Sequence, residues 1–337
     1  MGKKELLARW LYGIGLTRPL EGIGRPSLRI LAYHRVYDMI DENSFAADPE
    51  LVSASVADFR LQMQYIRKYW NPIPLSVAVD VLASGERLPD HCVVVTFDDG
   101  HLDNFTLAYP ILLEQGIPAT IFLSTGYIGG TVPFWFDRVA TLLFLAPTGH
   151  LHIPLLNLDL GLGDIQSRRA GTARVLTTLK GVPDELRRSA VAALEAELGR
   201  HAETADPGLT GVMSWDQVRE MAQHGIEFGS HSVSHPILSR LSDAAIFAEL
   251  MESRQTLERE LGREINLLAY PVGKEHAFDS RVVSIARTCG YKAGVAYVDG
   301  VNHDGSTDLF SLRRMSVERY YSHASFVARL VMPGVFA

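Results

Sequence analysis

Apolar runs of strand length alternate with segments of helical periodicity along most of the chain. Continuous apolar runs are typical of strands that are buried on both faces, and apolar residues three or four positions apart are typical of helices that pack on one face. The runs predict strands at 28–33, 92–97, 118–123, 226–229, 265–270, 292–296 and 310–317. The helical spacings predict helices at 56–69, 76–83, 105–115, 215–224, 243–261, 280–289 and 323–332. Because strands that alternate with helices pair in parallel, we predict an α/β fold.

This alternation is interrupted between residues 131 and 211. The segment opens with FWFDRVATLLFL, continues through a loop and then becomes rich in helix-forming residues, without a strand of the buried kind. We therefore predict a mostly helical insertion at about 131–211, within one domain that spans 28–337. The aromatic residues that open the insertion suit stacking on a ligand ring and packing of the insertion's own core equally well. They are Phe134, Trp135 and Phe136.

Residues 1–27 precede the first strand and form a separate segment with an amphipathic helix. Its apolar positions are Leu6, Leu7, Trp10, Leu11 and Ile14, and its basic positions are Lys3, Lys4 and Arg9. We favour a helix docked on the domain, because apolar stripes usually face a core, with peripheral contact to a membrane surface as the alternative. We find no export signal and no segment long enough to span a bilayer, which predicts a cytoplasmic protein, membrane-associated under that alternative.

The composition excludes some classes of partner. With 337 residues, 47% hydrophobic and 21% charged, the chain is typical of a globular protein with an ample core. A formal net charge of -7 argues against a nucleic-acid surface, which would need clustered Lys and Arg. Cys92 and Cys289 lie far apart in apolar settings, so we expect buried free thiols and no disulfide.

Chemically distinctive side chains follow several of the predicted strands. Asp98 and Asp99 end VVVTFDDG, and His231 and His235 end IEFGSHSVSH, with the two imidazoles spaced as on one turn of a helix. Because the carboxyl ends of barrel strands share one rim, these groups should converge. A catalytic zinc-type site uses three protein ligands and leaves room for water. The sequence therefore offers three ligands and one spare carboxylate that could serve as a base.

Three motifs in order, TFDDG, SHSVSHP and AYPVG, resemble those of the polysaccharide deacetylases of carbohydrate esterase family 4. The resemblance implies a distorted (β/α) barrel of about seven parallel strands that removes N-acetyl groups from an amino sugar in a polysaccharide, oligosaccharide or glycolipid. It implies that Asp98 is the general base and that one divalent metal ion, Zn with Co, Ni or Mn as alternatives, is held by Asp99, His231 and His235. It also implies that Tyr270 and Pro271, in the third motif, contact substrate.

Two features of the sequence differ from the usual family pattern. The third motif, LLAYPVG, lacks the Arg that normally holds the base, and Arg314 or its neighbour Arg313 could supply one from LFSLRRMSV. The late catalytic His that often follows a Leu in the family has no match in this chain. LAYHRV instead resembles the N-terminal Tyr-His segment of a permuted branch related to poly-N-acetylglucosamine de-N-acetylases, which implies that His34 is the general acid. The remaining histidines near the rim could bind substrate, but we expect ordinary surface residues. They are His101, His276 and His303.

Two other functions remain open on the sequence. The same metal chemistry would hydrolyse a different amide, such as a cyclic ureide. A relative that binds carbohydrate without catalysis is the other alternative, favoured only by the missing Arg of the third motif.

Overall fold

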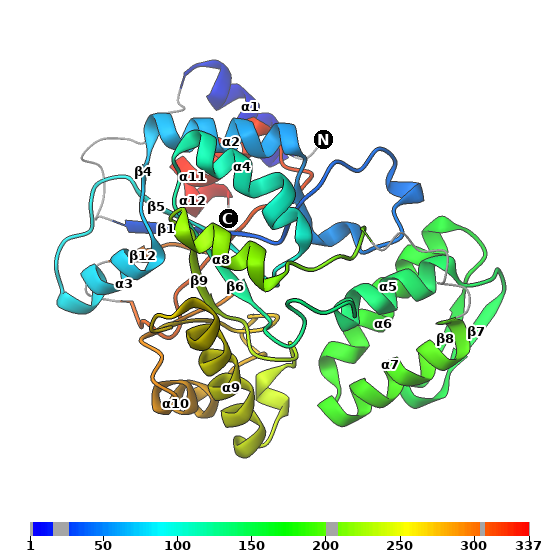
Figure 1. The fold of residues 1–337 in the computed structure, drawn as a ribbon. Helices are drawn as coiled ribbons and strands as arrows, with labels where there is room; N and C mark the ends of the chain where they lie inside the picture. Colours follow the sequence, from blue (N-terminus) through cyan, green and yellow to red (C-terminus); the bar gives the residue numbers. More distant parts are fainter. Residues whose placement is uncertain (1–2, 16–26, 200–207, 304–306, 337) are drawn as a thin grey trace.

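A curled, mainly parallel sheet forms the centre of the molecule (Figure 1). The computed structural model describes residues 3–15, 27–199, 208–303 and 307–336. Neighbouring strands follow the order β11-β10-β9-β6-β5-β1-β12. Their bounds are β1 Ser27–Tyr33, β5 Cys92–Phe97, β6 Ala119–Leu123, β9 Glu227–Ser230, β10 Leu267–Ala269, β11 Ala293–Val295 and β12 Asn302–His303. The predicted α/β fold, a distorted barrel of about seven parallel strands, is confirmed.

The segment after β12 closes the curl of the sheet. Leu312 forms a parallel bridge with Val295 of β11, and β13 (Met315–Ser316) pairs in parallel with β1. The sequence predicted one continuous strand here, but the chain forms a single bridge and then a two-residue strand. Four short strands were not predicted, because two or three residues carry no periodicity. They are β2 (Arg35–Val36), β3 (Val52–Ala54), β4 (Asn71–Pro72) and β12.

Helices cover the outer face of the sheet (Figure 1). Side chains on one face of the strands form the larger core beneath these helices, and those on the other face form a smaller interior core with one face of α3. The helix bounds agree with the predicted ranges to within one residue, except that α4 is preceded by a π-helical turn. The helices are α2 Val56–Tyr69, α3 Leu75–Ser84, α4 Tyr109–Gln115, α8 Trp215–Gln223, α9 Asp243–Leu261, α10 Ser280–Thr288 and α11 His323–Val331; the turn is Asn104–Ala108.

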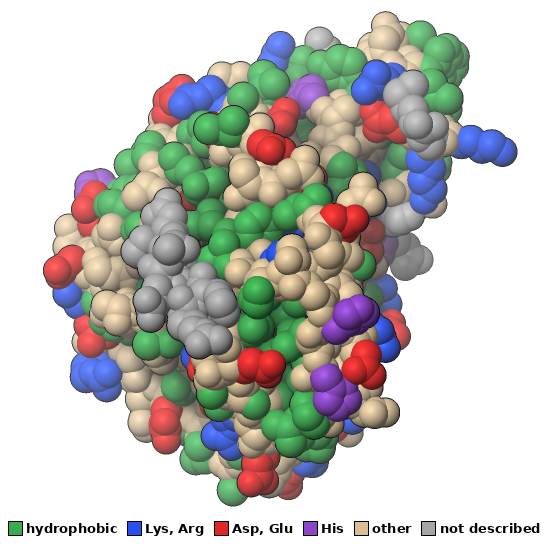
Figure 2. Space-filling model, turned by 90° about the vertical axis from the view of Figure 1, so that its right-hand side faces the viewer, with side chains coloured by type: hydrophobic (Ala, Val, Ile, Leu, Met, Phe, Trp, Pro, Cys, Tyr) green, Lys and Arg blue, Asp and Glu red, His purple; other side chains and the backbone are tan. Residues whose placement is uncertain are grey.

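The segment between β6 and α8 packs around its own hydrophobic core beside the sheet (Figure 1). It contains α5 (Trp135–Leu145), α6 (Ile165–Gly181) and α7 (Asp184–Leu198). The loop expected between the first two helices is an antiparallel hairpin, β7 (His150–Ile153) with β8 (Leu158–Gly161). Its strands bury only alternate residues, so they lack the continuous apolar run that marked the strands of the main sheet. From this side, charged side chains of both signs are interspersed with hydrophobic ones (Figure 2).

The two ends of the described chain meet on one side of the sheet. Helix α1 (Lys3–Gly13) packs against α11, and α12 (Pro333–Phe336) completes the small cluster between them. Within the described ranges, no helix is long and apolar enough to cross a bilayer. Cys92 and Cys289 are buried and are not joined in a disulfide, as predicted.

Gly294 on β11 packs closely against Tyr270, which allows a test of the packing inside the barrel. A Cβ added at Gly294 would lie 2.4 Å from the Tyr270 hydroxyl, which donates a hydrogen bond to the Phe310 carbonyl. We expect Gly294→Ala to lower the free energy of unfolding by about 1–3 kcal/mol, measured by urea denaturation. Gly163→Ala is the control, since an added Cβ there meets nothing within 4 Å. Equal stability of the two variants would contradict the close approach.

Candidate active site

Side chains from the carboxyl ends of three strands line one cavity of about 470 Å³. His34 follows β1, Asp98 and Asp99 follow β5, and His231 follows β9. His235 reaches the same cavity from the loop after β9. The structure therefore brings together every residue that the sequence suggested as a metal ligand, base or acid.

Asp98 forms a bidentate ion pair with a buried arginine, Arg314. Arg314 Nη1 and Nη2 each donate to one Asp98 carboxylate oxygen at 2.7 Å, and both side chains are almost fully buried. Two further guanidinium donors are also satisfied, because Arg314 Nε donates to the Ala296 carbonyl and Nη1 also donates to Thr96 Oγ1. Arg313, the alternative candidate, is exposed and donates to the Asp299 carbonyl. Of the two arginines in LFSLRRMSV, Arg314 is therefore the one that contacts Asp98.

The charge of Asp98 follows from this pairing. Burial by itself disfavours a carboxylate, but the Arg314 guanidinium outweighs burial and holds the pKa of Asp98 well below its ordinary range. Asp98 is therefore ionised at neutral pH and has both oxygens fixed in direction. An ionised, oriented carboxylate at the cavity floor can accept a proton from a neighbouring water molecule.

Asp99, His231 and His235 form a compact group of potential metal ligands. One ligand atom from each lies within 4.8 Å of the others, and all three side chains are buried. Asp99 Oδ1 is 3.6 Å from His231 Nε2 and 3.4 Å from His235 Nε2, and it has no hydrogen-bond partner among the described residues. A buried carboxylate oxygen facing two imidazole nitrogens is the donor set that zinc and related divalent ions prefer.

The two imidazoles are prepared to act as neutral ligands. His231 Nδ1 lies 2.8 Å from the Ala269 carbonyl, which can accept its proton and so leaves the Nε2 lone pair free. Burial, followed by the nearby His231, lowers the pKa of His235 well below its ordinary value. Because only neutral imidazole binds a metal, both features fit a divalent ion at this position.

The segment that carries the two histidines is a tight loop and not a turn of helix, which corrects the local geometry inferred from their spacing. Ser232 and His235 adopt positive φ angles of 66° and 54°. Glu249 on α9 holds the loop, because its carboxylate accepts hydrogen bonds from the backbone of Val233 and from both the backbone and hydroxyl of Ser234. Sequence reasoning could not identify Glu249, since a Glu on a predicted helix is ordinarily solvated.

The main chain at His34 is fixed on both sides, and its ring lines the cavity. Its backbone N–H donates to Ser53 Oγ, and its carbonyl accepts from Asn104 Nδ2. The imidazole packs at a tilt against Tyr297, with 5.3 Å between ring centroids. Burial lowers the pKa of His34, although the carboxylates of Asp99 and Asp98 oppose this effect. A protonated His34 would therefore release its proton more readily than an ordinary histidine.

The sequence analysis expected His101 to lie on the surface, but in the structure it is buried. It is completely buried, with Nε2 2.8 Å from the Asp137 carboxylate and Nδ1 3.9 Å from Asp99 Oδ2. Asp137 lies on α5 and is also completely buried. The imidazole of His101 thus lies between Asp99 and the carboxylate of Asp137. Sequence reasoning missed Asp137 because an acid near the start of a helix is usually a solvated residue that favours the helix dipole.

Neither Tyr270 nor Pro271, the substrate contacts expected in the third motif, lines the cavity. Tyr270 is completely buried, stacks on Phe278 at 4.1 Å between centroids and bonds to the Phe310 carbonyl. The turn after β10 instead exposes the next residues along the chain to the cavity. They are Val272, Lys274 and His276.

The segment 131–211 forms one wall of the cavity. Helix α6 contributes Leu176, Thr177, Lys180 and Gly181, and α5 contributes Phe136. Phe134 and Trp135 are buried in the core of the segment, whereas Phe136 both joins that core and packs edge-on against His235. Of the two roles open to these aromatics, packing therefore describes all three, and only Phe136 also reaches the cavity.

A family model described as polysaccharide deacetylase matches residues 85–151 and 163–294, which is more than half of the chain. The chain belongs to the polysaccharide deacetylase family. The matched residues include Asp98, Asp99, His231 and His235 but not His34 or Arg314. Of the two residues outside the match, the sequence analysis inferred His34 from the likeness to the permuted branch. It left open whether Arg314 or Arg313 contacts the base.

Individual relatives are distant. YxkH of Bacillus subtilis, itself named only as a candidate polysaccharide deacetylase, is 23% identical over 250 residues, which are 74% of this chain and 59% of YxkH. The poly-beta-1,6-N-acetyl-D-glucosamine N-deacetylase of Escherichia coli is 30% identical over 90 residues, 26% of this chain and 12% of that protein. The chain thus spans less than two thirds of the length of either relative.

Solved structures support the fold. The Streptococcus pyogenes deacetylase PplD, in complex with acetate, superposes with a TM-score of 0.59 at 20% identity, covering 89% of this chain and 96% of its own. IcaB from Ammonifex degensii gives a TM-score of 0.58 at 20% identity, covering 91% and 98%. At this identity the likeness concerns the arrangement of strands and helices.

The Asp98–Arg314 pair makes a measurable contribution to stability. We expect Arg314→Met to lower the free energy of unfolding by about 3–5 kcal/mol at neutral pH, because it leaves a buried carboxylate unpaired. The pKa of Asp98 is lower in the folded protein than in the unfolded chain, so the pair stabilises above the unfolded pKa of about 4 and its contribution is lost as the pH falls further. The difference from wild type should therefore shrink in acid.

Urea denaturation at several pH values measures this difference. Arg313→Met is the matched control, because it removes an exposed guanidinium from the adjacent position. It should change the stability by no more than about 0.5 kcal/mol. If the two variants are equally stable, the ion pair does not have the role that its geometry suggests.

Proposed function

We propose that this chain is a metal-dependent carbohydrate de-N-acetylase. The observation that carries the proposal is the arrangement of Asp98, fixed and ionised by Arg314, directly beside the three potential metal ligands. Membership of the polysaccharide deacetylase family supports the same reaction class. In this assignment Asp99, His231 and His235 hold the ion, Asp98 is the general base and His34 is the general acid.

The ion would polarise the acetyl carbonyl and acidify a water molecule. Asp98 accepts the proton of the attacking water, and its low pKa keeps it in the form that can do so. The water oxygen bonds to the acetyl carbon, the C–N bond breaks, and the amine nitrogen takes a proton from His34. Transfer of the Asp98 proton to His34 restores both groups. The products are acetate and a free amino sugar.

We propose zinc as the resident ion, with cobalt, nickel or manganese as alternatives, because all accept two imidazoles and a carboxylate. The substrate is an N-acetylated amino sugar in a polysaccharide, oligosaccharide or glycolipid. The E. coli relative is named for a poly-N-acetylglucosamine substrate, which supports an N-acetylglucosamine unit here. In the domain organisation we propose, residues 28–337 form the catalytic domain and the insertion at 131–211 completes one side of its cavity.

The reaction is tested by acetate release from N-acetylated chito-oligosaccharides, with and without chelator. We expect activity that a chelator removes and that added Zn²⁺ restores. Hydrolysis of a cyclic ureide in place of the oligosaccharide would support the other amide reaction. Binding of oligosaccharide without acetate release in the metal-loaded protein would support a relative that binds without catalysis.

Single substitutions separate the two roles at the site. Asp98→Asn should lower kcat by at least about a thousandfold while metal content stays stoichiometric, because the base is lost and the ligands remain. His231→Ala should lose the metal itself. Metal content by elemental analysis and kcat from acetate release measure the two effects, and full metal occupancy with full activity in His231→Ala would refute the assignment.

The buried pair behind Asp99 should tune metal affinity. We expect Asp137→Asn to weaken metal binding about 10- to 100-fold, because His101 loses the carboxylate that orients it toward Asp99. Competition with a chromophoric chelator measures the affinity. Asp159→Asn, in the exposed hairpin of the same segment, is the control. Unchanged affinity in Asp137→Asn would show that the pair only packs the interior.

A further inference from the structure

Helix α1 exposes an apolar face on the side opposite to its docking contact. Ala8 is completely buried, and with the partly buried Leu11 it faces Ala328 and Phe336 of the C-terminal helices. At 100° per residue, Leu6 and Trp10 lie on the far side of the helix from this contact, and Ile14 and Leu7 lie between them and Leu11. Their exposed fractions are 52% for Leu6, 41% for Leu7, 61% for Trp10 and 53% for Ile14, just beyond the helix end.

This concentration is unusual within the described part of the chain. Every other helix described there exposes at most one large hydrophobic side chain, such as Leu61 on α2 or Phe247 on α9. The docking contact therefore does not account for most of the apolar surface of α1. An indole is well suited to the boundary between water and lipid, because it combines an apolar ring system with a polar N–H.

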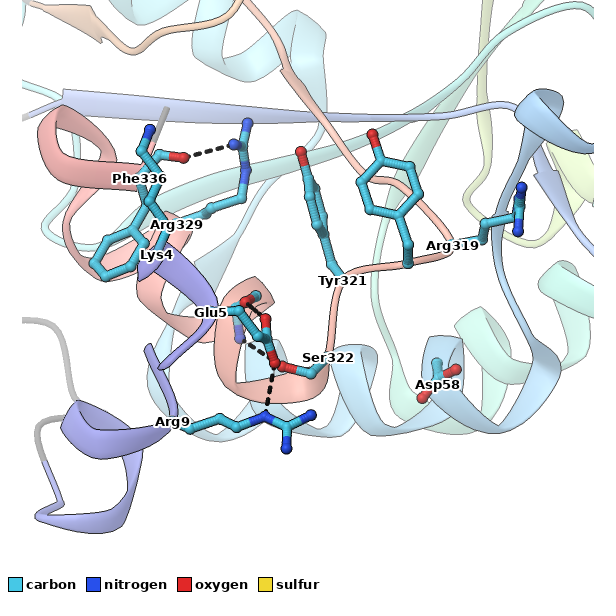
Figure 3. A pocket seen from close by; sticks show the side chains of 11 residues that line it. Lys4, Glu5, Arg9, Asp58, Arg319, Tyr321, Ser322, Arg329 and Phe336 are labelled. Atoms are coloured by element: carbon cyan, nitrogen blue, oxygen red, sulfur yellow. Dashed lines mark hydrogen bonds and ion pairs between the residues drawn. The ribbon is translucent and has the colours of Figure 1, made fainter. Parts of the chain in front are cut away.

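Positive charge flanks the same face. Lys3, Lys4 and Arg9 are exposed on α1. A cavity of about 790 Å³ lies between α1 and the segment that leads into α11, and Arg319 and Arg329 line it from the domain side (Figure 3). The lining also includes two acids, Glu5 and Asp58. The arginines of the lining are paired with carboxylates: Arg9 with Glu5, Arg319 with Glu42 and Glu50, and Arg329 with Asp299.

The cavity adjoins the catalytic cleft. Tyr320 lines both the cavity beside α1 and the cavity that contains Asp98 and Asp99. Arg319, next along the chain, spans the same boundary, since it forms ion pairs with Glu50 at the cleft and with Glu42. A molecule held at the surface beneath α1 therefore lies next to the entrance of the proposed active site.

We propose that α1 seats the protein on the surface of an anionic lipid bilayer, where its apolar face enters the interface and its basic residues meet lipid phosphates. Resting on the proposed function, the inference extends to the substrate class: an amino sugar carried by a lipid, which reaches the cleft past Tyr320. The helix is docked on the domain, as the sequence favoured, and we propose that its exposed face makes the membrane contact that was the alternative.

Vesicle co-sedimentation of the full chain tests the docking without any need for catalysis. We expect binding to vesicles of phosphatidylcholine with phosphatidylglycerol, weaker binding to phosphatidylcholine alone, and weaker binding at high salt. The double variant Leu6→Ala, Trp10→Ala should reduce binding about tenfold or more. Phe247→Ala, which removes an exposed aromatic ring from α9, is the control and should bind like wild type. Wild-type binding by the double variant, or no vesicle binding by wild type, would overturn the proposal.

Acetate release then tests the substrate class. With an N-acetylglucosaminyl lipid in phosphatidylglycerol vesicles, the double variant should lose about tenfold or more in kcat/KM, whereas its rate on soluble chito-oligosaccharides should equal that of wild type. An equal loss on both substrates would overturn the lipid-borne substrate. If wild type releases acetate from neither, the proposed reaction fails, and co-sedimentation still decides the membrane contact independently.

Discussion

The ion pair between Arg314 and Asp98 joins the closure of the barrel to the chemistry of its rim. Arg314 belongs to the segment that bridges β11 and β1, and Asp98 ends the central strand β5. Removing both charges from water is costly, and four hydrogen bonds from the guanidinium, two of them to Asp98, offset this cost. A chain that closes its sheet differently could not fix this carboxylate, so the fold and the candidate base depend on one interaction.

The same pairing determines what Asp98 can do. A carboxylate with so low a pKa is a weak base, and it cannot take a proton from ordinary water at a useful rate. The proposed reaction therefore requires that an ion held by the neighbouring ligand group lower the pKa of the water first. Asp99, with an unpartnered oxygen that faces two imidazole nitrogens, supplies the position for such an ion. The strong hold on Asp98 and the buried ligand set are two parts of one arrangement.

The sequence predicted most of the barrel because its buried strands are continuous apolar runs and its helices are long. It also placed Asp98, Asp99, His231 and His34 correctly at strand ends, where register leaves little freedom. Spacing failed where the chain turns sharply: the positive φ angles at Ser232 and His235 make a loop that four-residue spacing alone suggested as helix. The hairpin of the insertion was missed because only alternate residues are buried.

Side-chain direction was the least predictable property, because it depends on contacts between segments far apart in sequence. Tyr270 turns into the core since Phe310 offers it a carbonyl, and His101 is buried since Asp137 arrives from another helix.

That second contact bears on the role of the insertion. Trp135 donates its indole N–H to the His235 carbonyl, and Asp137, two residues later, bonds to the histidine behind Asp99. One short stretch of α5 thus contacts both sides of the ligand group, while α6 lines the cavity above it. A buried carboxylate is strongly destabilising unless it has a partner, and the partner of Asp137 is His101, beside Asp99. A segment that only enlarged the surface would not need such a pair. The insertion is therefore an integral part of the site, and its removal would disturb the ligand group before it altered the width of the cleft.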